Sequence, residues 1–396
     1  MNAVDSTDEL TAFRTPTSPW ITVGQVGAAL AASMGIGRFV YTPVLPLMEA
    51  QAGLTPSAGA ALATANYLGY LVGALAGIVL PGLMRSAAAM RVSMLILTTT
   101  LALMPVTSNE TAWAVLRCVA GATSAMVFVI AVSAMHSNLS GHAAYLSGWA
   151  FGGIGAGIAL SGLVVLILRS VSTWSSVWWA AALLTLICTL AAWTLTPERA
   201  PTAPTAERRR SHKQGHRRFG ALFVSYSLEG VGYIIAGTFL VAAIDHTAGS
   251  FAGSGAWVLV GLAALPSGPL WVLLGRRWSR PILLVIALVI QAAGIALPAV
   301  AGGFWPALVS AFLFGGTFLG ISQMSLTIGA HLQFPRAVAI LTTGYSLGQI
   351  AGPLIVTPLL SDGYHLALLV ASGIVLAAAL AAAVPTARFR QRATVE

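Results

Sequence analysis

Three ionisable side chains lie deep inside long apolar stretches of the sequence: Arg38, Arg117 and Glu229. An exposed charge at the middle of a bilayer costs about 2.5 kcal/mol or more, so residues of this kind usually mark transport pathways. Glu229 lies roughly 15 Å into its stretch, at 1.5 Å per helical residue. This depth predicts that Glu229 carries protons. Contact with a substrate, or neutralisation of an arginine alone, are the alternatives.

Arg38 lies in the stretch MGIGRFVYTPVLPLM (34–48), which also contains Gly35, Gly37, Pro43 and Pro46. A guanidinium keeps its charge, so it needs an anion, carbonyl groups or water as partners. We expect Arg38 to bind a substrate or to take part in coupling; the alternative is that it snorkels to the membrane interface. The polar side chains that we expect in the same cavity are Tyr41, Tyr67, Tyr226, Tyr233, Gln323 and Gln349.

The composition is that of a protein that crosses a membrane many times. Hydrophobic residues make up 57% of the chain and charged residues 8%, and the mean hydropathy is +0.85. The net charge of +9 does not indicate a nucleic-acid partner, because the basic residues lie in the connections between apolar stretches. HExxH, CxxC and Walker patterns do not occur, and the GxSxG match GYSLG (344–348) lies inside an apolar stretch, so we expect no enzyme, no cofactor and no metal site.

Polar and charged breaks divide the chain into twelve stretches that are long enough to cross a bilayer as helices. These stretches are 20–47, 56–82, 92–108, 111–135, 143–168, 175–195, 219–244, 252–274, 281–300, 306–330, 337–360 and 366–385.

Basic residues follow the even-numbered stretches. Arg85 follows the second, Arg276 and Arg277 follow the eighth, and a basic cluster follows the sixth. By the positive-inside rule, both termini and this central linker face the cytoplasm, as in a multi-pass protein of the bacterial inner membrane. The expected organisation is a tail (1–19), a first bundle (20–195), a basic linker (196–218), a second bundle (219–386) and a tail (387–396).

The two halves of the sequence align at offsets of 194 to 196 residues. MGIGRF (34–39) matches EGVGYI (229–234), GAT (121–123) matches GGT (315–317), and Gly148 and Gly152 match Gly344 and Gly348. Each match is short, but the three agree on one register. We therefore predict an all-α membrane protein in which twelve transmembrane helices form two pseudo-symmetric six-helix bundles.

Along its whole length the chain resembles the major facilitator superfamily. The stretches GIGRFVYTPVLPLM (35–48), YSLEGVGYIIAGTFL (226–240) and GYSLGQIAGPLIVTPL (344–359) are similar to its uncharacterised YbfB/YjiJ-type bacterial branch. The resemblance implies two bundles that rock around a central site and expose it to each side of the membrane in turn. It also implies that the first helix lines this site.

The resemblance bears on Arg117 and on the cytoplasmic gate. Arg117 and Gly121 resemble the R-x-x-x-G motif of the superfamily's fourth helix, which implies a role in proton transfer; a structural bond to neighbouring carbonyls is the alternative. The loops at 77–91 and 268–280 keep basic residues but lack the acidic residue of the superfamily's gate motif. We expect Arg85, Arg276 and Arg277 to act at this gate with other partners.

Small residues at helical spacing suggest helix packing and weakly favour export. Gly344, Gly348, Gly352 and Pro353 form a G-x-x-x-G-x-x-x-G-P run, and Gly148 and Gly152 belong to a glycine-rich stretch in the position of an antiporter motif. We predict a monomeric secondary transporter that exports a small organic solute in exchange for protons. A proton-coupled importer or uniporter of a small organic anion is the alternative, and a membrane sensor or scaffold without transport is a remote one.

Overall fold

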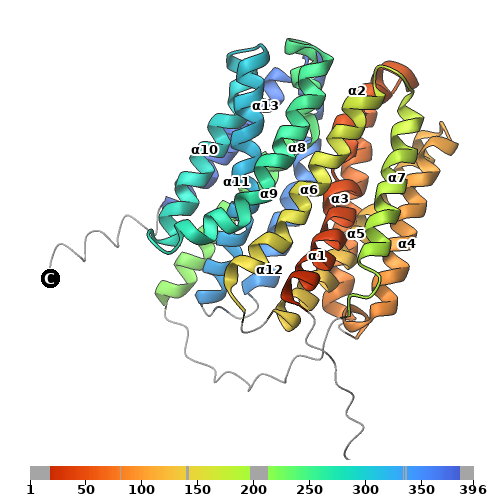
Figure 1. Ribbon diagram of the computed structural model, residues 1–396. Helices are drawn as coiled ribbons and strands as arrows, with labels where there is room; N and C mark the ends of the chain where they lie inside the picture. Colours follow the sequence, from red (N-terminus) through yellow and green to blue (C-terminus); the bar gives the residue numbers. More distant parts are fainter. Residues whose placement is uncertain are drawn as a thin grey trace, which may run out of the picture.

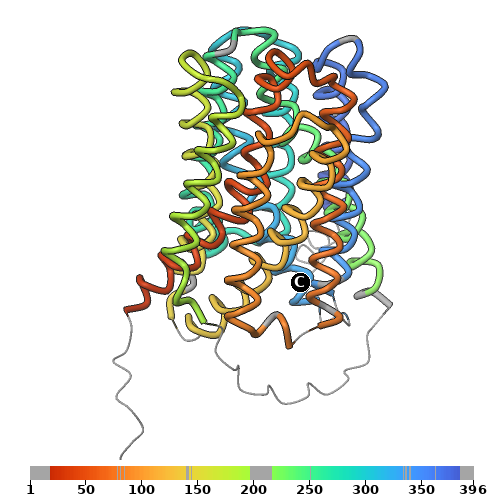
Figure 2. Tube along the Cα trace, turned by 90° about the vertical axis from the view of Figure 1, so that its right-hand side faces the viewer, coloured from red at the N-terminus to blue at the C-terminus, as the bar shows by residue number. Residues whose placement is uncertain are grey.

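The computed structural model describes residues 18–80, 82–139, 142–196, 213–332, 334 and 337–383. The tail before residue 18, most of the predicted linker and the predicted C-terminal tail lie outside these ranges. The described chain is a bundle of long helices that run roughly side by side (Figures 1 and 2). The predicted all-α membrane fold is confirmed.

For description we divide the helices into two halves. The N-terminal half contains α1 (Pro19–Leu30), α2 (Tyr41–Ala52), α3 (Pro56–Val79), α4 (Ala87–Leu103), α5 (Glu110–Asn138), α6 (Ala144–Leu168) and α7 (Trp174–Ala191). The C-terminal half contains α8 (Lys213–Ala248), α9 (Ser250–Leu274), α10 (Arg280–Val300), α11 (Phe304–His331), α12 (Ala337–Val356) and α13 (His365–Ala383). Short π- or 3₁₀-helical segments are η1 (Ala31–Ile36), η2 (Leu83–Arg85), η3 (Met104–Val106) and η4 (Thr357–Asp362).

Eleven segments of the described chain are long and apolar enough to cross a membrane, and the first of them, Pro19–Ala52, joins α1, η1 and α2. The twelfth long helix, α12, contains Thr342, Thr343, Ser346 and Gln349. As described below, several of these residues lie where the halves meet.

The two halves meet along α6 and α9, which lie against each other near the middle of the bundle (Figure 1). Within the halves, α3 packs on α5, α8 packs on α12 and α13, and α10 packs on α11 and α13. We call the end where α1 begins, α7 ends and α8 begins the linker end, and the opposite end the distal end. In Figure 2 the red start of α1 marks the linker end, at the bottom of the view.

The first membrane span is not the continuous helix that the sequence predicts. It passes from α1 into a π-helical turn, η1, and then into a non-helical turn at residues 37–40 before α2 begins. Thr42 donates its backbone N–H to Phe39 at 3.3 Å and not to Arg38, as a regular helix requires. Pro43 has no N–H to offer to the preceding turn. The carbonyls of Gly37 and Arg38 are therefore left without helical partners in the middle of the bundle.

Candidate functional site

The turn at residues 37–40 lies opposite Arg117 of α5. The guanidinium donates from Nη1 to the carbonyl of Gly37 and from Nη2 to the carbonyl of Arg38, both at 3.1 Å. Asn66 of α3 donates to the carbonyl of Arg117 at 2.9 Å, and the ring centroid of Tyr41 lies 4.9 Å from the guanidinium carbon. Arg117 thus replaces the hydrogen bonds that the broken helix lacks. This geometry favours the structural interpretation of Arg117.

Arg38 is buried among tyrosine rings of α3. Its guanidinium carbon lies 4.5 Å from the ring centroid of Tyr70 and 4.9 Å from that of Tyr67. The residue is 3% exposed, and its Nε and Nη2 have no hydrogen-bond partner in the part of the chain that the structure describes. A permanent cation that lies on aromatic faces and has unpartnered donors has the chemistry that an anion requires.

Glu229 of α8 is fully buried in the C-terminal half. Neither carboxylate oxygen has a hydrogen-bond partner among the described residues, so Glu229 forms no ion pair with Arg38. The buried amide of Gln291, from α10, lies beside the carboxylate. Burying a carboxylate without a counter-charge is costly unless it binds a proton. The site therefore contains one separate charge-bearing group on each side of the boundary between the halves.

Two tyrosines of the C-terminal half are close enough to feel both charged groups. Tyr233 of α8 and Tyr345 of α12 are each within electrostatic range of both Arg38 and Glu229. Their ring centroids lie 5.9 Å apart, and Tyr226 stacks on Tyr345 at 4.4 Å. Tyrosine hydroxyls can donate and accept hydrogen bonds, so this pair adds polar groups to the surroundings of both charges.

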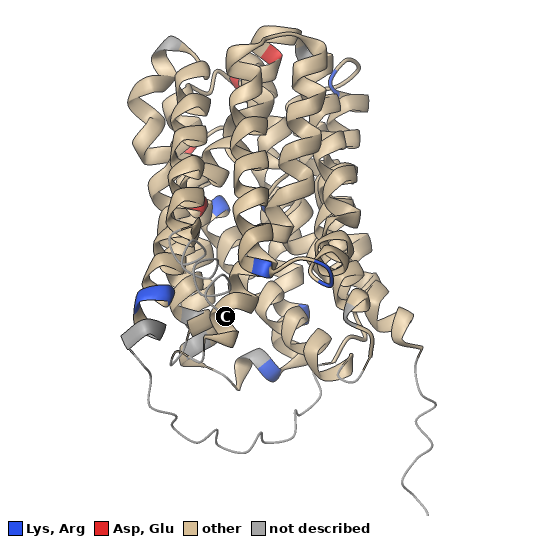
Figure 3. Cartoon of the chain, turned by 90° about the vertical axis from the view of Figure 1, so that its left-hand side faces the viewer, with Lys and Arg blue, Asp and Glu red and all other residues tan. Residues whose placement is uncertain are grey.

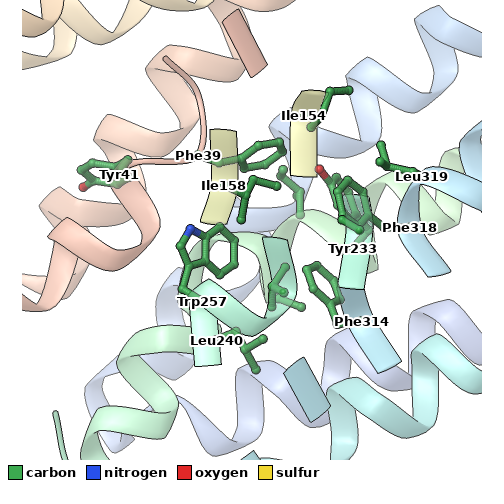
Figure 4. Close-up of a cluster of buried hydrophobic side chains, with 14 of the residues drawn as sticks. Phe39, Tyr41, Ile154, Ile158, Tyr233, Leu240, Trp257, Phe314, Phe318 and Leu319 are labelled. Atoms are coloured by element: carbon green, nitrogen blue, oxygen red, sulfur yellow. The ribbon is translucent and has the colours of Figure 1, made fainter. Parts of the chain in front are cut away.

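Phe39, from the turn in the first span, enters an aromatic cluster of the C-terminal half. Its ring centroid lies 6.4 Å from Tyr233, 6.4 Å from Trp257 and 6.5 Å from Phe318, each with an edge-to-face arrangement. Figure 4 shows Phe39 directed toward this cluster and Tyr41 on the far side of its helix. The turn thus places neighbouring side chains in different environments, and Phe39 fills the centre of the bundle.

Five side-chain hydrogen bonds join described residues of the two halves, and all of them lie between the middle of the bundle and the distal end. The partners are Thr42 and the Gly237 carbonyl, Tyr67 and Thr238, Tyr364 and Glu49, Arg169 and Asp245, and Arg169 and Ser254. The Tyr364 hydroxyl donates to Glu49 at 2.6 Å, and Arg169 and Asp245 form an ion pair at 3.4 Å. These bonds hold the distal end closed.

At the linker end, a cavity of about 580 Å³ lies between α3 and α5 of one half and α11 and α12 of the other. Its walls are mostly apolar, with Thr342, Thr343 and Ser346 as the polar lining residues. Leu71 and Ser346 line it and directly follow Tyr70 and Tyr345 in the chain. Along the chain, the cavity lining thus comes within one residue of Tyr70 and Tyr345.

The structure brings only some of the predicted cavity residues to this place. Gln349 is buried on α12, one helical turn from Tyr345. Gln323 of α11 lies beside Gly268 of α9, with its Oε1 buried and unpartnered among the described residues. Tyr41 donates to the carbonyl of Gly59 at 2.9 Å inside the N-terminal half, which places it away from the central cavity.

The predicted packing residues lie at close helix contacts. A Cβ at Gly148 or Gly152 would come within 3.0 Å of the α9 backbone, and one at Gly35 would do the same with α6. Gly37 packs on Leu97, and the three glycines of α12 pack on α8: Gly344, Gly348 and Gly352. Pro43 and Pro46 lie in α2, and Pro353 lies in α12. The predicted gate residues Arg85, Arg276 and Arg277 are exposed at the linker end.

Sequence reasoning missed Tyr70, Tyr345 and Gln291. Tyr70 comes three residues after Tyr67, and Tyr345 four residues before Gln349, so each shares a helix face with a residue that was predicted. That spacing is the signal that identifies them. Gln291 is an isolated amide within an apolar stretch, but which helix it faces depends on the packing of α10 against α8.

A bundle of long helices with buried charges where its halves meet, closed at one end and hollow at the other, is the architecture of a major facilitator transporter. The crystal structure of a mutant of the nucleoside transporter NupG superimposes with a TM-score of 0.70, covers 93% of this chain and 100% of its own, and is 14% identical in sequence. At that identity the likeness shows the fold alone.

Residues 30–383 match the family described as "Uncharacterised MFS-type transporter YbfB", and the chain belongs to this family. The resemblance inferred from the sequence is confirmed. No curated protein matches the sequence. The family and the fold make the chain a secondary transporter and a multi-pass membrane protein.

Proposed function

We propose that this transporter exports a small organic anion or zwitterion in exchange for protons, with Glu229 as the proton carrier. The observation that carries the proposal is the burial of the Glu229 carboxylate without a hydrogen-bond partner among the described residues. In such surroundings burial of the protonated carboxyl group costs much less free energy than burial of the carboxylate. Glu229 holds its proton while the site is closed and releases it when water reaches the site.

Arg38 binds the anionic group of the solute in this proposal. Its free guanidinium donors are supported by the tyrosine rings of α3, and charge-assisted bonds from a guanidinium to a carboxylate are strong and directional. Tyr233 and Tyr345 connect the two groups, because both lie within range of both charges. Arg117 acts as a positioning residue that holds the backbone on which Arg38 stands.

In the proposed export cycle the solute enters from the cytoplasmic end. The described basic side chains at the ends of membrane spans lie mainly at the linker end, and by the positive-inside rule this supports a cytoplasmic linker end. A solute then enters from the cytoplasm through the cavity of about 580 Å³. Opening of the distal hydrogen bonds, and closure of the linker end, release it outside.

The test uses purified protein in proteoliposomes with an imposed pH gradient. A panel of small organic anions, zwitterions and hydrophobic cations is first screened by thermal stabilisation, and the stabilising compounds are then assayed for flux. We expect proton flux that depends on the solute and solute movement opposite to that of protons. Movement of solute and protons in the same direction would assign import, and flux that ignores the pH gradient would assign uniport.

A further inference from the structure

A second cavity, of about 420 Å³, lies inside the C-terminal half at the linker end. Its inner wall is apolar and includes Leu222 of α8, Leu284 of α10 and Ile328 of α11. Its rim carries two arginines, Arg218 of α8 and Arg280 of α10. The cavity therefore combines an apolar wall with arginines at its mouth. It is separate from the cavity of about 580 Å³ between the halves.

The arginine of α10 is held in place by a histidine. Nη1 of Arg280 lies 3.4 Å from Nε2 of His331, and Nδ1 of His331 lies 2.7 Å from the carbonyl of Thr327. The Nδ1–H donates to this carbonyl, which leaves Nε2 to accept a hydrogen bond from Arg280. The guanidinium is thus oriented by the protein, and its charge is not neutralised by this contact.

No carboxylate lies at the linker end within the described ranges. The carboxylates in those ranges are Glu49, Glu110, Glu229, Asp245 and Asp362, of which Glu229 lies inside a span and the others lie toward the distal end. Figure 3 shows basic residues gathered toward the lower end of the bundle and acidic ones above them. The two arginines that line the mouth of the cavity suit an anionic ligand.

The cavity lies at the level of lipid headgroups. The membrane-spanning part of α8 begins at His216, that of α10 begins at Arg280, and that of α11 ends at His331. Trp278, which also lines the cavity, is 56% exposed, as expected for an aromatic residue at the membrane interface. A ligand that enters here meets headgroup phosphates at the mouth and acyl chains beside the wall.

We propose that this cavity binds one anionic phospholipid, with the headgroup phosphate between Arg218 and Arg280 and an acyl chain along the Leu222–Leu284 wall. Basic pockets between transmembrane helices on the cytoplasmic side are suited to anionic headgroups, and guanidinium groups bind phosphate strongly. The site does not involve Glu229 or the transported solute, so the lipid proposal can be tested separately from the proposed function.

Native mass spectrometry of the purified full chain in detergent tests the proposal, with dioleoylphosphatidylglycerol and dioleoylphosphatidylcholine as the lipids. We expect the wild type to retain one phosphatidylglycerol with clear preference over phosphatidylcholine. Arg218→Gln with Arg280→Gln is expected to weaken this binding roughly 30-fold, since each basic residue near the surface contributes about 1 kcal/mol. Arg280→Gln alone, the milder change, is expected to weaken it roughly fivefold.

The matched control is Arg276→Gln with Arg277→Gln, which removes the same charge from exposed neighbours that do not line the cavity. This variant is expected to bind phosphatidylglycerol as the wild type does. Equal weakening in both double variants would overturn the proposal in favour of diffuse attraction to the basic end. Displacement of the lipid by millimolar inorganic phosphate would overturn it in favour of a site for free anions.

Discussion

Arg117 donates a hydrogen bond of 3.1 Å from Nη2 to the backbone carbonyl of Arg38. A second bond of the same length runs from its Nη1 to the carbonyl of Gly37. Two guanidinium nitrogens therefore bind two successive carbonyls of the non-helical turn in the first membrane span. Arg117, which supports the turn, is thus bonded directly to Arg38, whose side chain carries a charge into the site. We therefore expect a change at Arg117 to alter the position of Arg38.

Replacement of Arg117 by lysine is expected to lower stability, because a lysine cannot bind both carbonyls with a planar fork. Loss of one charge-assisted bond costs about 1.5 to 3 kcal/mol, which is measured as a lower thermal midpoint in detergent. Arg91→Lys is the matched control, since Arg91 also donates to a carbonyl, that of Trp193, but at the exposed surface. Equal shifts in the two variants would contradict the role of Arg117 in the turn.

Replacement of Arg38 is expected to weaken solute binding while leaving the fold intact. Arg38→Lys keeps a charge but loses the planar donor set, so we expect roughly tenfold weaker binding of an anionic solute, and roughly 100-fold for Arg38→Gln. Thermal-shift titration with a solute found in the screen measures this. Arg85→Gln, at an exposed position, is expected to bind normally. Unchanged affinity in Arg38→Gln would remove Arg38 from the solute site.

The sequence is sufficient to predict the helical membrane fold, because the apolar stretches and their basic connections are local features of the chain. It also identifies Arg38, Arg117 and Glu229, since an ionisable residue in an apolar stretch is visible without a structure. The break in the first span, at residues 37–40, was not predicted, although Pro43 and Pro46 follow it closely in the sequence. The physical reason for the break is that Pro43 removes a donor from the turn that precedes it.

Contacts between the halves are beyond what the sequence predicts. Tyr41 and Tyr233 are both aromatic residues near a pseudo-repeat, yet Tyr41 bonds to Gly59 within its own half, while Tyr233 meets Phe39 across the boundary. The backbone turn decides this difference by rotating the side chains that follow it. Tyr345 is within range of both charged groups because of how α12 packs on α8, which the sequence does not reveal.

Removal of the Tyr364 hydroxyl is expected to open the distal end more often. Tyr364→Phe loses the 2.6 Å hydrogen bond to Glu49, and a bond of this kind contributes about 0.5 to 1.5 kcal/mol. The open population should rise roughly 3- to 10-fold, measured by spin-label distances between positions 57 and 361 in a background without Cys118 and Cys188. Tyr145→Phe, at an exposed position of α6, should not change these distances. An unchanged distribution in Tyr364→Phe would show that this bond does not hold the halves together.

Alanine at two glycines is expected to have opposite effects on stability. A Cβ at Gly155 of α6 would come within 3.0 Å of the α9 backbone, whereas one at Gly255 of α9 meets no atom within 4 Å. Overpacking of a close contact costs about 1 to 3 kcal/mol, while Gly→Ala at a compatible helical position stabilises by about 0.4 to 1 kcal/mol. Gly155→Ala should therefore lower the thermal midpoint and Gly255→Ala should raise it. A rise in both would contradict the close packing of α6 on α9.

The central claim is that Glu229 carries the proton, and Glu229→Gln in proteoliposomes tests it most directly. Glutamine keeps the size and polarity of the side chain, but its amide neither takes up nor releases a proton near neutral pH. We predict that the variant still exchanges labelled for unlabelled solute at equal concentrations, and that an imposed pH gradient no longer drives net solute movement. Glu110→Gln, at an exposed carboxylate, is expected to behave as the wild type. Gradient-driven transport at wild-type levels in Glu229→Gln would contradict the account.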